Sequence, residues 1–241
     1  MAKAPKKAMN LSQAVAQDLG AAIVSGRLDR DAPFPTELEL CRHYGASRTA
    51  LREAIKMLTA KGLLVVRPRL GARIRPEPDW NLLDPEVLQW LLERAFTYGL
   101  LIEFTEIRLA VEPGAAALAA RCPDPEARRQ IEKAADDLFA AERGEVDPLE
   151  ADIAFHVAIL NASGNRFYLQ LRDMIAAALR FSIRLTNDYK GMTTTAQDHK
   201  RIADAVLAGD ATAAAEATRT LIVEALELIR RAEAENRSVE G

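Results

Sequence analysis

Hydrophobic residues in the first third of the chain recur with the period of amphipathic helices. A first helix is predicted over residues 11–25, and Gly26 ends it. Its apolar face is formed by Leu11, Val15, Leu19 and Ile23. A second, shorter helix is predicted to begin at Pro35 and Thr36. The residues expected to bury that helix in the core are Leu38, Leu40 and Cys41.

A third helix and a β-hairpin are predicted to follow. Gly45 marks a turn, and Ser47 is expected to cap the next helix by accepting a backbone N–H. The positions expected to face inward are Ala50, Leu51, Ala54, Ile55 and Leu58. After Gly62, short extended runs at residues 63–67 and 72–75 predict a hairpin with a basic tip. Two helices around a glycine turn, followed by such a hairpin, are typical of a winged helix-turn-helix.

The pattern of the remaining chain is one helix after another. Asp-Pro pairs, in which Asp caps a helix and Pro takes its first position, stand at residues 84–85, 124–125 and 147–148. Glycine stops and helical periodicity give about six or seven helices, without strand-like alternation. The predicted fold class is therefore mainly α, with an N-terminal winged helix-turn-helix and a C-terminal all-α helical bundle.

Charge follows the same division of the chain. Residues 1–78 carry 14 Lys and Arg against seven Asp and Glu, a net charge of +7, whereas residues 79–241 carry 18 against 28, a net charge of −10. We expect a mobile basic arm over residues 1–10, a winged helix-turn-helix over 11–78 and an acidic helical domain over 79–236. A basic first domain suits a partner rich in phosphates, such as duplex DNA.

The predicted DNA-contacting residues lie on the second helix, the third helix and the hairpin. In this motif the N-terminal end of the third helix enters the major groove, where Arg can hold guanine through two hydrogen bonds. The set comprises Thr36, Glu37, Ser47, Arg48, Thr49, Arg52, Arg67, Arg69 and Gly71. The alternative for Arg48 and Arg52 is a solvated or ion-paired face, for which Glu37 and Glu53 are available partners.

A candidate metal site lies in the acidic domain. Asp152 and His156 are four residues apart, so they share one face of a predicted helix whose other residues are apolar. His199 stands early on a later helix and could converge with them. Asp and two His suffice for a divalent transition metal with open positions for water or a ligand. Two alternatives stay open: a metal-free pocket in which the histidines bind an acidic ligand, and histidines satisfied in the core.

Arg108 is a candidate for binding a ligand carboxylate. It lies in the middle of an Ala- and Leu-rich helix, where it either pairs with Glu106 or Glu112 or faces a ligand. The predicted effector-binding set also includes Arg184, Tyr189 and Thr195. Thr195, one turn before His199, could offer a hydroxyl, and the polar, glycine-containing loop over residues 189–194, which begins with Tyr189, could cover the pocket.

The first domain resembles the DNA-binding head of the GntR family of bacterial transcription regulators. Residues 34–41, 46–54 and 61–64 carry the resemblance, which covers most of residues 11–76. It implies a regulator that binds operator DNA. The family often has an Arg between the two acids of the second helix, where it contacts DNA. Leu38 stands there in this chain, so one contact that the resemblance implies is missing or replaced.

The acidic domain resembles the effector-binding and dimerisation domain of the FadR subfamily. Matching segments include residues 106–113, 152–156, 161–165 and 198–210. Many members bind a metal through Asp and three His. The resemblance therefore implies Zn, Ni or Mn held by Asp152, His156 and His199, while the last His position is occupied by Leu221. It also favours a ligand role for Arg108, and residues 79–90 resemble a branch that responds to sugar acids of the galactonate type.

These observations favour a homodimeric repressor that a small carboxylate, with a sugar acid preferred, releases from a palindromic operator. The alternative is a metal-dependent enzyme acting on a small organic acid through Asp152, His156 and His199. Against the enzyme, the sequence has no His-Glu-xx-His pattern, nucleophile elbow or Gly-rich phosphate loop. A third option is a constitutive DNA binder whose acidic domain only dimerises.

The sequence also favours the cytoplasm and no membrane partner. The basic N-terminus is not followed by the apolar segment of a secretory signal, and no apolar run approaches a membrane span. The two cysteines, Cys41 and Cys122, are far apart and lack metal-binding or disulfide-framework spacing.

Overall fold

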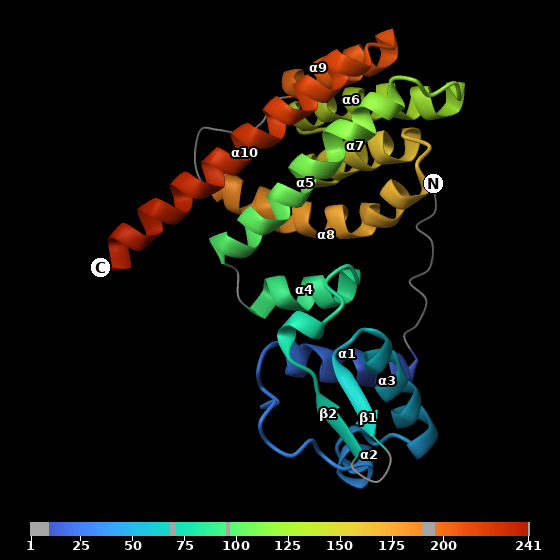
Figure 1. Ribbon diagram of the computed structural model, residues 1–241, viewed down its shortest axis with the longest axis vertical. Coiled ribbons are helices and arrows are strands. Elements are labelled where there is room, and N and C mark those ends of the chain that lie inside the picture. Colours follow the sequence, from blue (N-terminus) through green and yellow to red (C-terminus); the bar gives the residue numbers. More distant parts are fainter. Residues whose placement is uncertain (1–9, 68–70, 95–96, 189–195, 241) are drawn as a thin grey trace. The chain divides into compact units, whose positions relative to one another are not determined.

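The computed structural model describes residues 10–67, 71–94, 97–188 and 196–240 (Figure 1). The side chains of residues 181–188 and 237–240 lie outside this description. Contacts between Cα atoms divide the chain into two compact units, Met1–Ala95 and Phe96–Gly241. Among the described residues, the first unit combines helices with a two-stranded sheet and the second is entirely helical. The mainly α fold class expected from the sequence is thus confirmed.

Three helices open the first unit, and side-chain caps begin each of them. They are α1 (Leu11–Val24), α2 (Glu37–Tyr44) and α3 (Arg48–Ala60). Asn10 and Thr36 form capping boxes for the first two, in which the third residue of the helix bonds back to the cap. The Ser47 hydroxyl accepts the Ala50 N–H at 3.2 Å, as the sequence predicted. Gly45 ends α2 at a φ of 59°, the left-handed region that a tight helix-turn-helix junction requires.

The core of the first unit is formed by the apolar faces of these helices. Its fully buried members include Val15, Leu19, Leu51, Leu58, Leu63 and Leu64. Leu38 was expected there but is 48% exposed, whereas Leu40 is 5% exposed. Residues two positions apart lie about 200° apart around a helix, so these two leucines cannot face the same core. Cys41, Ala50 and Ile55, also expected inside, are half-buried.

A short antiparallel hairpin follows α3. Strand β1 (Leu64–Arg67) pairs with β2 (Gly71–Ile74), with Leu64 opposite Ile74 and Arg67 opposite Gly71. Leu64 is buried while Val66 and Arg67 are exposed, so the hairpin is anchored to the core at its base. This is the wing that the sequence predicted.

The segment after the wing folds back onto the first unit instead of leaving it. It contains a single 3-10 turn, η1 (Glu77–Asp79), and the helix α4 (Pro85–Arg94). Trp80 donates its indole N–H to the Arg75 carbonyl at 3.0 Å, and Trp90 packs against Gly20 of α1. The division between the units therefore falls after Ala95, whereas the sequence placed it after residue 78.

Partly buried polar contacts hold α4 in that position. The Lys61 ammonium pairs with Asp84 at 2.7 Å and also with Glu86, and it lies 5.9 Å from the centroid of the Trp90 ring. Gln17 of α1 accepts the Trp90 indole N–H at 3.2 Å. The two tryptophans act as packing anchors, 9% and 6% exposed, and α4 belongs to the first unit.

The second unit contains six helices among its described residues. They are α5 (Tyr98–Ala119), α6 (Pro125–Glu142), α7 (Pro148–Ala162), α8 (Arg166–Asp188), α9 (Ala196–Ala208) and α10 (Ala211–Glu240). Asp124 and Asp147 cap α6 and α7 ahead of a proline at the first helical position, as their sequence pattern predicted. With α4, the described residues after residue 84 form seven helices, within the six or seven that the sequence predicted.

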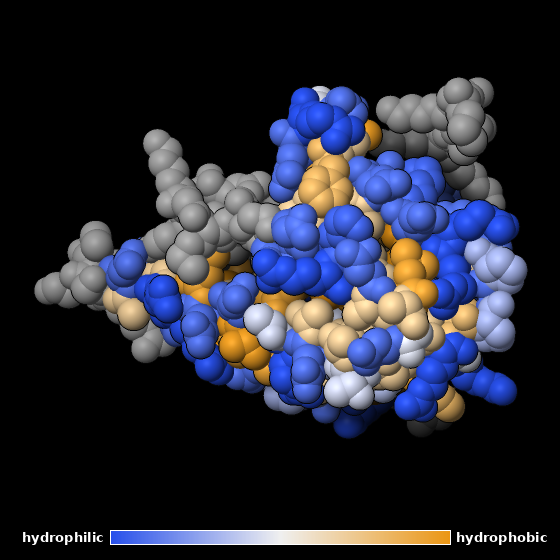
Figure 2. Space-filling view, turned by 90° about the horizontal axis from the view of Figure 1, so that it is seen from above, coloured by the Kyte–Doolittle hydropathy of each residue, from blue (hydrophilic) through white to orange (hydrophobic). Residues whose placement is uncertain are grey.

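Helix α5 is the central element of the second unit. It packs along α10 and also contacts α7, α8 and α9, while α6 lies against α7 and α9 (Figure 1). The face shown in Figure 2 is mostly hydrophilic, with smaller hydrophobic areas between the charged side chains. Among the described residues, no helix is both long enough and apolar enough to cross a membrane.

Candidate functional sites

The first unit presents its predicted DNA-contacting residues at the start of α3. Ser47 caps the helix, and the side chains of Arg48 and Thr49 that follow it are exposed. An amphipathic helix whose apolar side is buried and whose N-terminal end is exposed and cationic can enter a major groove. Arg48 and Thr49 at the start of α3 are thus exposed, as a helix that contacts DNA requires.

Arg52, one turn later on α3, is held by Glu37 of α2. Its Nε donates to Glu37 Oε1 at 3.1 Å and its Nη2 to Oε2 at 3.3 Å. These bonds and the charge of Glu37 raise the pKa of Arg52. The ion-paired alternative considered for Arg52 is therefore present, whereas Glu53 pairs with Lys56 instead. Both members of the Arg52–Glu37 pair are exposed, so the pair contributes little to stability and can open.

The wing carries the remaining predicted contacts. Arg67 ends β1 opposite Gly71, which has a φ of 77° and so favours glycine. Arg69 lies outside the described residues. A groove of about 920 Å³ runs between α3 and the wing, and both Thr36 and Arg52 line it. The described members of the DNA-contacting set thus come from neighbouring parts of one small unit.

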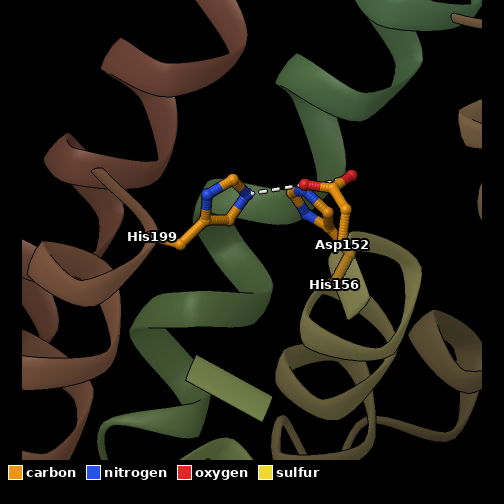
Figure 3. Close-up of side chains that lie close together, drawn as sticks. All are labelled: Asp152, His156 and His199. Carbon is orange, nitrogen blue, oxygen red and sulfur yellow. Dashed lines mark ion pairs between the residues drawn. The ribbon is translucent and has the colours of Figure 1, made fainter. Parts of the chain in front are cut away.

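In the second unit, the three predicted metal-ligating side chains converge. Asp152 and His156 project from successive turns of α7, and His199 approaches them from α9 (Figure 3). His199 Nε2 lies 2.9 Å from Asp152 Oδ1, and His156 Nε2 lies 3.9 Å from Asp152 Oδ2. The histidines are 3% and 1% exposed, and the Phe155 ring packs edge-on against both.

Helix α5 adds two charged residues to this cluster. Arg108 Nε donates to Glu112 Oε1 at 2.6 Å, and Arg108 Nη2 lies 3.1 Å from His156 Nε2. Glu112 Oε2 lies 2.6 Å from His156 Nδ1. Arg108 and Glu112 are 4% and 2% exposed. Glu106, the other partner considered for Arg108, instead pairs with Arg230 at the surface at 2.9 Å.

The sequence pointed to Glu112 only as a partner of Arg108, so its contact with a histidine was missed. The four-residue spacing from Arg108 signals the ion pair within α5. The contact with His156 depends on how α5 packs against α7, and no local pattern encodes that packing. We call Arg108, Glu112, Asp152, His156 and His199 the buried polar cluster.

Both carboxyl groups of the buried polar cluster are ionised at neutral pH. Burial by itself would raise the pKa of Glu112, but the charges of Arg108 and His156 and their hydrogen bonds lower it to about 2. Burial likewise opposes ionisation of Asp152, but the hydrogen bond from His199 and the nearby cationic groups lower its pKa below the ordinary value. Two buried carboxylates require compensating cations.

The donor set of Asp152, His156 and His199 fits a divalent transition metal. One carboxylate oxygen and two imidazole nitrogens are suitable ligands, and the three atoms lie within 4.8 Å of one another. Ligand atoms about 2.0–2.2 Å from one tetrahedral metal lie about 3.4 Å apart, so the more widely spaced side chains would have to close by about 1 Å to bind it. Leu221, 4% exposed on α10, offers no ligating atom at the fourth position of the resemblance.

The other predicted effector-binding residues are not placed with the cluster. The Arg184 side chain, Tyr189 and Thr195 lie outside the described residues. Among the predicted effector-binding residues, Arg108 is the one whose side chain is described. It contacts His156, one of the predicted metal ligands.

Comparison with known proteins matches both units. A family model described as bacterial regulatory proteins of the gntR family matches residues 11–74, and one described as the FCD domain matches residues 103–224. The galactonate operon transcriptional repressor of Escherichia coli K12 is 34% identical over 216 residues, which cover 89% of this chain and 94% of that protein.

Two further similarities agree with those matches. The uncharacterized HTH-type transcriptional regulator YieP of Escherichia coli K12 is 33% identical over 88% of this chain and 93% of its own length. The solved structure of Lar from Listeria monocytogenes has a TM-score of 0.59 at 18% identity, covering 94% of this chain and 99% of that one, which supports the fold. The chain belongs to the GntR family of bacterial regulatory proteins, with an FCD domain as its helical unit, and is a transcription regulator rather than an enzyme.

Proposed function

We propose that this regulator is a repressor that leaves its operator when its helical unit binds a small hydroxycarboxylate together with a divalent metal. The observation that carries the proposal is the buried polar cluster. Arg108, two histidines and two carboxylates are placed among apolar helices, where purely structural packing would favour hydrophobic side chains. A guanidinium beside three candidate metal ligands is suited to an anionic ligand.

The charge of the buried polar cluster favours a bound cation. Histidines ligate a metal in their neutral form, and in that form Arg108 balances one of the two carboxylates and leaves a net charge of −1. A divalent metal changes this to +1, which a single ligand carboxylate then neutralises. A metal-free site reaches neutrality only by protonating a histidine and then has no excess charge for an anion. Burial makes such a charge match worth more than it would be in water.

Asp152, His156 and His199 are the residues that would hold the metal. The metal would be Zn, Ni or Mn, because imidazole and carboxylate ligands suit these ions. When bound, it supplies a Lewis-acidic position with open coordination sites for ligand oxygens. Arg108 would bind the ligand carboxylate through guanidinium N–H groups not directed at Glu112, giving the pocket its preference for acids.

A sugar acid is the favoured ligand. The similarity to a protein named the galactonate operon transcriptional repressor extends over 89% of this chain, including the helical unit. Galactonate is an aldonate with a hydroxyl group beside its carboxylate, so one molecule offers two neighbouring oxygens to a metal and further hydroxyls to polar side chains. Arg184, Tyr189 and Thr195 are proposed to line the remainder of the pocket.

DNA recognition is assigned to the first unit. Arg48, Thr49 and Arg52 of α3 would read base edges, while Thr36 and the wing residues Arg67, Arg69 and Gly71 would contact the backbone or minor groove. Ser47 and Glu37 would act at the same interface, as cap and as partner of Arg52. A homodimer would present two such units to the half-sites of a palindrome.

The testing experiment measures binding of the purified protein to its own upstream DNA at a fixed salt concentration, because phosphate contacts are strongly salt-dependent. Galactonate, other aldonates, uronates and dicarboxylates are titrated with added Zn²⁺, and unrelated DNA of equal length serves as the control. We expect specific binding that one acid reverses. Specific binding unaffected by every acid would contradict the ligand-responsive part and favour a constitutive binder.

A further inference from the structure

Glu112 uses its two carboxylate oxygens on two different partners. Oε1 accepts the Nε–H of Arg108 at 2.6 Å, and Oε2 lies 2.6 Å from Nδ1 of His156. Arg108 precedes it by one turn on α5, whereas His156 belongs to α7. The Glu112 side chain is 2% exposed, so water does not compete for these contacts. One carboxylate thus joins the proposed carboxylate-binding residue to a proposed metal ligand.

The contact with Glu112 determines which nitrogen of His156 is available to a metal. A carboxylate only accepts hydrogen bonds, so Nδ1 must carry the proton that it donates to Glu112 Oε2. In the neutral ring Nε2 then holds the lone pair. In this structure Nε2 lies 3.1 Å from Arg108 Nη2, whose N–H it can accept, and 3.9 Å from Asp152 Oδ2, so a metal bound at Nε2 would replace the Arg108 contact. Outer carboxylates that bond to a metal-bound histidine in this way fix its tautomer and ring orientation.

The same carboxylate determines where the guanidinium of Arg108 lies. Its Nε is held by Glu112 Oε1, and its Nη2 lies 3.5 Å from Oε2 and 3.1 Å from His156 Nε2. The Arg108 side chain is therefore anchored along one edge. The N–H groups of its other edge are left for a ligand, and a planar fork fixed in this way binds a carboxylate with little loss of side-chain freedom.

We propose that Glu112 is a positioning residue. It orients the His156 ring toward the metal and the Arg108 guanidinium toward the ligand carboxylate. This inference rests on the proposed function, since it assigns a role to Glu112 within the same site. Glu112 itself contacts neither ligand. It affects metal and ligand binding through the two hydrogen bonds that its oxygens accept, one from Arg108 and one from His156.

Two substitutions test the proposal in the full-length protein. Glu112→Ala removes both hydrogen-bond acceptors, and we expect Zn²⁺ affinity to fall about 10- to 100-fold, as for other outer-shell partners of ligating histidines, with a parallel loss of galactonate affinity. Glu112→Gln keeps the side-chain volume but has one acceptor oxygen, so it can serve His156 or Arg108 but not both. We expect at least one of its two affinities to fall tenfold or more.

Zn²⁺ affinity is measured by competition with a chromophoric chelator, and galactonate affinity by calorimetry on the Zn²⁺-loaded protein. Circular dichroism and the unfolding temperature first establish that each variant is folded; if Glu112→Ala is not, Glu112→Gln decides. Glu106→Gln is the matched control, because Glu106 lies on the same helix but pairs with Arg230 at the surface. The control should retain both affinities within threefold.

The outcomes separate the role of Glu112 from the proposed function. A purely structural role for Glu112 would lower the unfolding temperature but leave both affinities of the folded Glu112→Gln variant within threefold of wild type, which would overturn the inference. A wild-type protein that binds neither Zn²⁺ nor galactonate would contradict the proposed function instead.

Discussion

At the residue scale, the buried polar cluster brings into contact side chains that are far apart in the sequence. Arg108 and Glu112 come from α5, Asp152 and His156 from α7, and His199 from α9. Each charge in the cluster lies beside an opposite charge or a hydrogen-bond partner, which is what makes its burial tolerable. The following two predictions concern single members of this cluster.

Glu112 should make the stability of the helical unit depend on pH under acidic conditions. Its pKa is about 2, below the ordinary value of 4.5, so the folded state favours the ionised form. The resulting stabilisation is complete above pH 4.5 and is lost as pH falls toward 2. It amounts to roughly 3 kcal/mol at neutral pH. Urea unfolding at pH 7 and pH 3 measures it, and Glu112→Gln should show a smaller difference; an equal difference would contradict the prediction.

Arg108→Ala should abolish release by the effector while leaving operator affinity within about twofold. Arg108 lies beside the proposed metal ligands, in the second unit and outside the one that carries the predicted DNA contacts. Arg230→Ala, which removes an exposed arginine of α10 paired with Glu106, serves as the control. The measurement is operator binding at increasing galactonate concentration, and an Arg108→Ala protein that is still released would rule out its ligand role.

At the scale of elements, local signals were sufficient to predict the helices but not their contacts. Ser47 and the Asp-Pro caps satisfy backbone groups within a few residues, so their pattern determines where helices start. Leu38 was misjudged because hydrophobicity alone does not say which side of a short helix meets the core. The contact between Glu112 and His156 was beyond prediction because it depends on the packing of α5 against α7.

The start of α3 should carry the base-specific contacts. Arg48→Ala is expected to weaken operator binding by about 1–3 kcal/mol, and Arg52→Ala should act in the same direction but more weakly, because Arg52 must give up its bond to Glu37 to reach DNA. Arg143→Ala, which removes an exposed arginine of the helical unit paired with Glu145, is the control. Fluorescence anisotropy with labelled operator measures each affinity. Unchanged affinity in both α3 variants would reject α3 as the reading helix.

The docking of the segment after the wing should be sensitive to a single methyl group at Gly62. This residue has a φ of 77°, and a Cβ there would lie 2.7 Å from the Asp79 carbonyl oxygen. Gly26 has a φ of 73° with nothing within 4 Å of its added Cβ, so it isolates the backbone strain alone. We expect Gly26→Ala to cost about 1 kcal/mol and Gly62→Ala clearly more. Thermal unfolding measures the stability of both variants. Equal losses of stability would contradict the prediction, because they would mean that the segment after the wing can move to make room for the added methyl group.

At the scale of the whole molecule, the two units differ in net charge and in what their cores contain. The first is basic and is built around the helix-turn-helix, and the second is acidic and encloses the buried polar cluster. The sequence placed their boundary at the prolines after the wing because Pro-rich segments commonly join domains. The structure moves it beyond α4, because Trp90 and Lys61 tie that helix to the first unit, contacts that connect residues distant in the sequence.

Removing the metal should uncouple ligand binding from DNA release. Without a divalent cation the cluster carries a net charge of −1, or of zero once one histidine is protonated, so a carboxylate would lose the attraction of the metal-loaded site. After treatment with a chelator, the galactonate concentration for half-release of operator DNA should rise at least tenfold, while DNA affinity without galactonate stays the same. Adding back Zn²⁺ should restore the original concentration. An unchanged half-release concentration in verified metal-free protein would favour the pocket in which His156 and His199 bind the acid directly. The DNA-binding unit would then respond to the carboxylate alone, because a ligand shifts a two-state equilibrium only by its differential affinity for the two states.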